Sequence, residues 1–172
     1  MPDQARPVLL GVTRGQPDVA LKQAARVAAK FGSQLVCAHV DLGRYVVEEL
    51  PDGTVTSLPL DPDLPELNCN DFDQELADHI TKVLADQPVE LIFRELAGDT
   101  AYALARLADI MDAEVIIVGS RRHGITSGIK EFFAGSVAAQ LAHRQHRPVV
   151  VIPVAPVAPG RPLPWESDAS SQ

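Results

Sequence analysis

A glycine-bearing loop between two apolar runs holds the residues with the clearest potential for chemistry. The first run, Val115–Val118, is too short for a helix and indicates a strand buried on both faces, and Gly119 ends it. The loop then contains Ser120, Arg121, Arg122, His123 and Gly124. Gly135 and Ser136 open a helix that includes Val137. The loop and the helix start would together present unpaired backbone N–H groups, which bind anions.

Cationic side chains gather in this loop although the whole chain carries a formal net charge of -8. Arg121 and Arg122 are adjacent to His123, and Lys130 lies a few positions further on. In an acidic protein, a local basic cluster favours a phosphate ligand. Solvated loop charges beside turn-forming glycines would give the same pattern, so both interpretations stay open on these residues alone.

The run VIIVGSRRHG…FFAGSVAAQLAHRQHRPVVVIP resembles the carboxyl half of a universal stress protein domain, and the resemblance extends to the start of the chain. In nucleotide-binding members of that family, a glycine, two residues, a second glycine, nine residues and then Gly-Ser or Gly-Thr surround the ATP phosphates and ribose. Gly119, Gly135 and Ser136 match the outer parts of this pattern. Arg122 stands where the second glycine is expected, and Gly124 follows it two positions later.

The end of the first expected strand, Pro7–Val12, also differs from the family pattern. The family usually has Asp-Gly-Ser there, whereas this chain has Thr13, Arg14 and Gly15. Without the aspartate, the obvious protein ligand for a divalent ion is missing, so no metal site is predicted. Two interpretations follow. Either Arg14 and Arg122 hold phosphate directly, or the crevice no longer binds a nucleotide.

What the resemblance implies is ATP or a related adenine nucleotide, with Val40 near the base. The full predicted site comprises Val12, Thr13, Arg14, Val40, Gly119, Ser120, Arg121, Arg122, Gly124, Gly135, Ser136 and Val137. The alternative is a nucleotide-free dimeric stress protein that acts by interaction. No GxxxxGKS loop, GxSxG elbow or Cys-x-x-Cys pair occurs, so an enzyme is not predicted, although weak ATP hydrolysis stays open.

Strands and helices alternate along the chain and predict an α/β fold. The expected strands are Pro7–Val12, Leu35–Val40, Val89–Leu96, Val115–Val118 and Val149–Ile152. The expected helices have Asp18, Asp99 and Ser136 as caps. The first has Ala20, Ala24, Val27 and Phe31 on its apolar face and ends at Gly32, and one more has Phe72, Leu76 and Ile80 on its apolar face. His39, in the middle of an apolar strand, is predicted to be a satisfied core histidine. This alternation predicts a five-stranded parallel sheet with helices on both faces, and the resemblance supplies the order 3-2-1-4-5. Thr13 and Gly119 would then face one crevice.

Two segments depart from this alternation. Within residues 42–66, Tyr45–Leu50 and Thr54–Leu60 flank Asp52 and Gly53 and predict a β-hairpin, which could be a lid, a surface decoration or a dimer contact. Residues 154–172 are rich in proline and predict an extended or disordered tail. Residues 1–153 are therefore predicted to form a single domain.

Composition and the last strand suggest which partners the protein has. The strand formed by Val149, Val150, Val151 and Ile152 would be an edge, and similar proteins dimerise through this strand, so a homodimer is predicted. A sequence pI of about 5.0 argues against a nucleic-acid partner. The lack of a long apolar run and of a signal peptide predicts a cytoplasmic protein without membrane contact.

Overall fold

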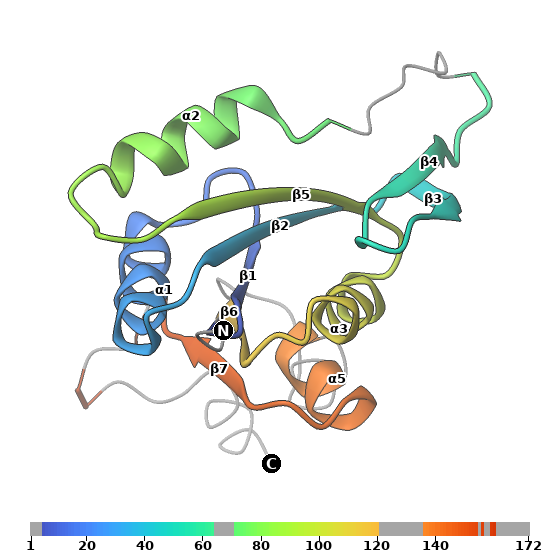
Figure 1. The fold of residues 1–172 in the computed structure, drawn as a ribbon. Coiled ribbons are helices and arrows are strands. Elements are labelled where there is room, and N and C mark those ends of the chain that lie inside the picture. Colours follow the sequence, from blue (N-terminus) through green and yellow to red (C-terminus); the bar gives the residue numbers. More distant parts are fainter. Residues whose placement is uncertain (1–4, 64–70, 121–135, 155, 157–158, 161–172) are drawn as a thin grey trace.

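A five-stranded parallel sheet forms the centre of the computed structural model, which describes residues 5–63, 71–120, 136–154, 156 and 159–160 (Figure 1). Its strands are β1 (Val8–Val12), β2 (Leu35–Asp41), β5 (Leu91–Ala97), β6 (Val115–Gly119) and β7 (Val149–Ile152). They lie in the order β5-β2-β1-β6-β7, and every neighbouring pair is parallel. Counted without the hairpin strands, this is the predicted order 3-2-1-4-5.

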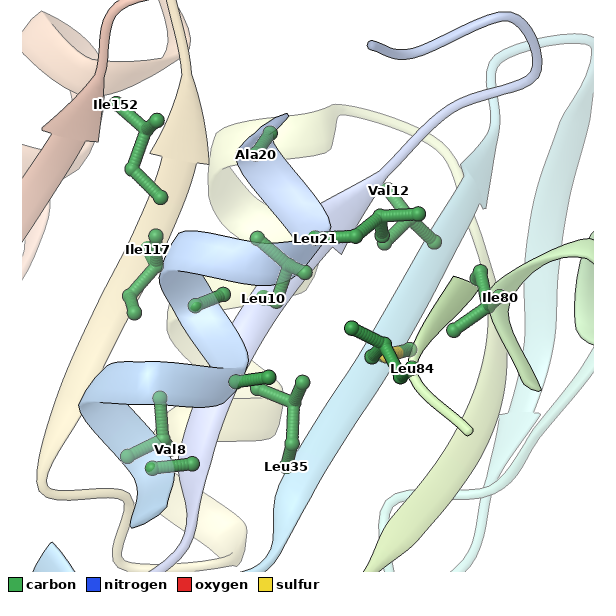
Figure 2. Close-up of a cluster of buried hydrophobic side chains, with 14 of the residues drawn as sticks. Val8, Leu10, Val12, Ala20, Leu21, Leu35, Ile80, Leu84, Ile117 and Ile152 are labelled. Atoms are coloured by element: carbon green, nitrogen blue, oxygen red, sulfur yellow. The ribbon is translucent and has the colours of Figure 1, made fainter. Parts of the chain in front are cut away.

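Among the described residues, two helices cover each face of this sheet. The helices α1 (Asp18–Phe31) and α2 (Gln74–Val83) share one apolar cluster with the sheet. The helices α3 (Thr100–Ile110) and α5 (Val137–Arg144) share the other. Successive side chains of a strand point to opposite faces. Leu10 therefore joins the α1 side, which Figure 2 shows, and Leu9 joins the α3 side.

The helix ends confirm some of the predicted caps and correct others. Asp99 caps α3, because its Oδ1 accepts the backbone N–H of Tyr102 at 2.8 Å. The prediction that Asp18 caps α1 is wrong, since Asp18 is already helical and Pro17 occupies the cap position without a side-chain bond. Ser136 occupies the cap position of α5 but makes no side-chain cap bond. Capping depends on the loop that precedes a helix, and the residue type alone does not determine it.

The buried face of α1 matches the predicted one in part. Ala20 and Ala24 are fully buried as predicted, together with Ala28 and beside Leu21, whereas Phe31 is half exposed. Small alanine side chains let the helix approach the sheet closely, so the packed face is built around them. Gly32 ends the helix as predicted, with a left-handed backbone at φ 62.

The predicted hairpin is present as β3 (Arg44–Glu49) and β4 (Val55–Pro59), which pair antiparallel. It lies beside α3 (Figure 1), where Arg106 of that helix binds Glu49 at 2.7 Å. A Cβ on Gly53 in its turn would lie 2.6 Å from Leu107 Cδ1, so glycine is needed for this close approach. The hairpin strands thus pack over α3, and none of their residues lines the crevice described below.

Two predicted segments extend beyond the described residues. The tail at 154–172 is described only at 154, 156, 159 and 160, and the end of the 42–66 excursion lies in the gap at 64–70. Within the described ranges, no helix combines the length and apolarity needed to cross a membrane.

Candidate functional site

A crevice of about 420 Å³ opens at the carboxyl ends of β1 and β6. These two strands are neighbours in the sheet, yet α1 follows β1 on one face and α5 lies on the other. The helices α1 and α5 thus lie on opposite faces of the sheet beside the ends of these two neighbouring strands. This is the topological switch point at which open α/β sheets bind ligands.

The lining of the crevice has an apolar part and a polar part. The apolar part comes from β2, β6, α3, α5 and the segments just after β2 and β7, and includes Ala38, Val40, Leu42, Leu104, Val118, Val137 and Val154. The polar part comes from the loop after β1, with Thr13, Arg14 and Gln16, together with Ser120 and Thr100. A ligand with one flat apolar portion and one polar portion would match this division.

Two glycines set the width of the crevice. A Cβ on Gly11 would lie 3.1 Å from Leu104 Cδ1, and a Cβ on Gly119 would lie 3.1 Å from Val154 Cγ1. Both distances are tighter than normal packing, so larger residues would push the crevice walls apart or fill the space between them. Neither glycine has a positive φ, so the backbone conformation itself does not require them.

Seven of the predicted site residues line the crevice. They are Val12, Thr13, Arg14, Val40, Gly119, Ser120 and Val137. Ser136 precedes α5 and is not among the lining residues. The predictions for Arg121, Arg122, Gly124 and Gly135 lie outside the described residues.

Sequence reasoning missed other lining residues. Gly11 had a readable signal, because an isolated glycine inside an apolar strand indicates close approach of another group. Thr100 and Leu104 come from α3, and only the packed fold brings that helix to the crevice. Gln16 had no sequence signal, since its role depends on one side-chain hydrogen bond.

That hydrogen bond fixes the loop after β1. The backbone N–H of Thr13 donates to Gln16 Oε1 at 3.1 Å, and the backbone N–H of Gln16 donates to the Thr13 carbonyl at 3.3 Å. With its oxygen so engaged, the Gln16 amide turns Nε2 toward Gly119, where it is buried and has no partner within the described residues. A buried donor without a partner costs about 1–3 kcal/mol, which a hydrogen-bonding ligand or a shifted side chain would recover.

Arg14 lines the crevice and is paired with an acidic side chain. Its guanidinium binds the carboxylate of Asp73, a residue 59 positions further along the chain. The other oxygen of that carboxylate caps α2 by accepting the Leu76 N–H at 2.7 Å. Arg14 therefore lines the crevice while its charge is shared with Asp73.

A second polar pair lies on β2 and β5, away from the crevice lining. His39 Nδ1 lies 2.7 Å from Glu95 Oε1, which gives the partly buried histidine the partner predicted for a satisfied core residue. The hydrogen bond to Glu95 raises the pKa of His39, and burial opposes that rise. On the same strand, burial raises the pKa of the Cys37 thiol to about 12, so this cysteine stays protonated and unreactive near neutral pH.

The described residues do not group into a metal site. Within 5–63, 71–120 and 136–154, no three side chains of histidine, cysteine, aspartate or glutamate are placed to hold an ion together. The described part of the crevice therefore offers hydrogen-bond donors and apolar contacts to a ligand.

The parallel sheet, its two helical layers and the switch-point crevice together define a doubly wound α/β protein with a ligand-sized site. Within that class, the chain belongs to the universal stress protein family, whose model matches residues 5–153. A comparison with curated proteins gave no match.

Solved structures of universal stress proteins share the fold. One is UspA from Lactobacillus plantarum, with 17% identity, a TM-score of 0.60, and coverage of 86% of this chain and 97% of that one. Another was solved in complex with cAMP, with 22% identity, a TM-score of 0.56, and coverage of 88% and 99%. A third, from Archaeoglobus fulgidus in complex with dAMP, has 21% identity, a TM-score of 0.53, and coverage of 87% and 98%.

Proposed function

We propose that this protein binds an adenine nucleotide, ATP or a related one, in the switch-point crevice. The observation that carries the proposal is the crevice of about 420 Å³, divided between apolar and polar linings and kept open by Gly11 and Gly119. The similar structures solved with cAMP and dAMP support the same ligand class. The proposed role is that of a cytoplasmic binding protein of the stress response, without a catalytic step.

The apolar lining would receive the adenine ring. Ala38 and Val40 of β2 and Leu104 of α3 all belong to the lining, and a flat base fits between such side chains. Burial of an aromatic ring against aliphatic groups would supply a large part of the affinity. Contacts of this kind do not depend on the number of phosphates.

The polar lining would receive the ribose and phosphates. Ser120 Oγ accepts the Val154 N–H at 3.0 Å, which leaves the hydroxyl proton free to donate to a ligand. At the start of α5, Ser136 makes no side-chain cap bond within the described residues, and a helix start of this kind would offer backbone N–H groups to an anion. These donors act without a metal ion, and we propose that binding does not need magnesium.

Isothermal titration of ATP, ADP, AMP and cAMP, with and without magnesium, tests this function. We expect binding that magnesium does not strengthen. Gly119→Val should weaken it at least about tenfold, because its side chain would fill space beside Val154. The control Ala142→Val adds bulk at an exposed position of α5 and should bind normally.

The result that would overturn the proposal is a wild-type protein without heat of binding or thermal shift at millimolar nucleotide. The alternative would then hold, namely a nucleotide-free dimer that acts by interaction.

We further propose that the protein is a homodimer through Val149, Val150, Val151 and Ile152 of β7. β7 is an edge of the sheet, and Val151 on it is 46% exposed.

A further inference from the structure

We propose that the β3–β4 hairpin is a docking surface for an extended, basic and apolar segment of a partner protein. The surface consists of the exposed apolar residues of the hairpin and its two flanks, which are Leu42, Tyr45, Val46, Val47, Leu50 and Leu60. It is separate from the nucleotide crevice, because only Leu42 belongs to both. The inference does not depend on nucleotide binding.

The apolar surface is concentrated in this one excursion. Val47 is 49% exposed and Leu60 is 62% exposed, on a segment where every strand residue of β3 after Arg44 is exposed. Strand periodicity places Arg44 and Val46 on one face and Tyr45 on the other, as far as the bulge at Val47. The Tyr45 side chain therefore points away from the face on which Arg44 is buried. Exposed apolar side chains concentrated in one segment mark interaction sites in folded proteins.

The β3–β4 hairpin also has a strand edge at which a further strand could pair. Within the described part of the chain, β3 pairs only with β4, so no second strand lies along the other edge of β3 from Tyr45 to Glu49. A bulge between Val46 and Glu48 interrupts the ladder but leaves Arg44, Tyr45 and Val46 in register with β4. An extended peptide can add to such an edge as a third strand, with main-chain bonds for affinity and side-chain contacts for selectivity.

Charge determines which peptide fits this surface. Glu48 lies in β3 between Val47 and Leu50, Asp52 lies in the turn between β3 and β4, and Asp61 and Asp63 follow β4. All four side chains are exposed. Arg44 is the one cationic residue among described positions 42–63, and it is buried, where Nε donates to Ser57 Oγ at 2.9 Å. The exposed charges of the hairpin are thus all negative, which favours a segment that alternates apolar residues with lysine or arginine.

The same charges disfavour a second copy of this hairpin as the occupant. Two copies would bring Glu48, Asp52 and Asp61 of each chain toward acidic groups of the other, and like charges across an interface cost free energy. Glu49 does not add to this charge, because Arg106 binds it at 2.7 Å. A basic partner removes the repulsion and adds attraction.

Fluorescence anisotropy with a short labelled peptide of alternating valine and lysine tests the proposal. We expect the full chain to bind it, with an affinity that falls as salt screens the acidic residues. A valine–glutamate peptide should not bind. A valine–lysine peptide N-methylated at alternate residues should not bind either, because one hydrogen-bonding edge is blocked.

Matched variants locate the binding on the hairpin. Val47→Ser should weaken binding of the valine–lysine peptide about tenfold, because it removes the contact of one half-buried valine side chain. Val19→Ser makes the same change at an exposed valine of α1 and should bind as the wild type does. Glu48→Gln should flatten the salt dependence. Unchanged thermal midpoints in all three would show that the variants fold.

Three results would overturn the proposal. Equal binding of the lysine and glutamate peptides would show that charge does not select the ligand. Self-association that Val47→Ser abolishes would show that a second copy of the chain occupies the surface. Peptide binding that begins only after residues 161–172 are removed would show that the carboxyl-terminal segment of the same chain occupies it.

Discussion

At the scale of single residues, the partly buried pair of His39 and Glu95 links the stability of the fold to pH. Glu95 accepts a hydrogen bond from it at 2.7 Å and raises its pKa in the folded state, with Asp41 adding to the rise and Arg14 opposing it. Because the folded protein holds this proton more tightly, the pair stabilises the fold fully below the unfolded pKa of about 6.5. That stabilisation disappears as pH rises through the higher, folded pKa.

Replacing this histidine should therefore cost more stability in acid than in base. We expect His39→Gln to lower the free energy of unfolding by about 1 kcal/mol or more near pH 6, and by clearly less at pH 9. Urea unfolding at several pH values measures the difference from wild type. His143→Gln removes an exposed imidazole of α5 as a control. A cost for His39→Gln that grows with pH would contradict the assignment.

Contacts between distant residues limited what could be predicted at this scale. Gly11 was readable as a glycine within an apolar strand, and Thr13 and Gly119 follow from the ends of their strands. The binding of Arg14 to Asp73 joins positions 59 apart, so no local pattern announces it. The position of a charged side chain depends on which partner the fold brings near it, so the sequence could not show that Arg14 is paired with Asp73.

At the scale of elements, the cap of α3 is a local feature with a measurable effect. Asp99 Oδ1 accepts the N–H of Tyr102, one of the helix donors that lacks a partner within the helix. Asp99→Ala should therefore lower the free energy of unfolding by about 1 kcal/mol. Asp18→Ala should cost less, because Asp18 caps no backbone group. Equal losses in urea titrations would show that charge near the helix start, and not the cap, is responsible.

The elements themselves were largely readable from the sequence. Branched apolar runs located β1, β2, β5, β6 and β7 to within about two residues. In β1 and β6 the run is apolar throughout because both faces are buried, whereas β7 is an edge strand with Val150 and Val151 exposed. The Asp52-Gly53 turn located the hairpin in the same way. The face of α1 was less readable, since its alanines and Phe31 are all apolar and only the closeness of the sheet decides which are buried. The placement of the hairpin over α3 likewise depends on tertiary contacts.

At the scale of the whole molecule, the chain has two surfaces on which a strand could pair, and a matched pair of substitutions separates them. Val151 lies on β7 and Val47 lies on β3, and both are close to half exposed. We expect Val151→Lys to convert the dimer to a monomer, because a charge on an edge strand blocks pairing with a second copy. Val47→Lys should leave the proposed dimer intact and weaken binding of the basic peptide. Sedimentation velocity measures the oligomeric state of both variants, and fluorescence anisotropy measures their affinity for the peptide.

The same experiment shows whether dimerisation and ligand binding are separable. The Ile152 carbonyl of β7 accepts the Ser120 N–H at 2.8 Å, so the last strand supports one wall of the crevice from within the chain. Val151→Lys leaves that backbone bond in place, and the monomer should keep its affinity for nucleotide. Loss of nucleotide together with the dimer would mean that the crevice needs the second copy. A wild-type protein that sediments as a monomer would contradict the proposed dimer and leave β7 as an open edge.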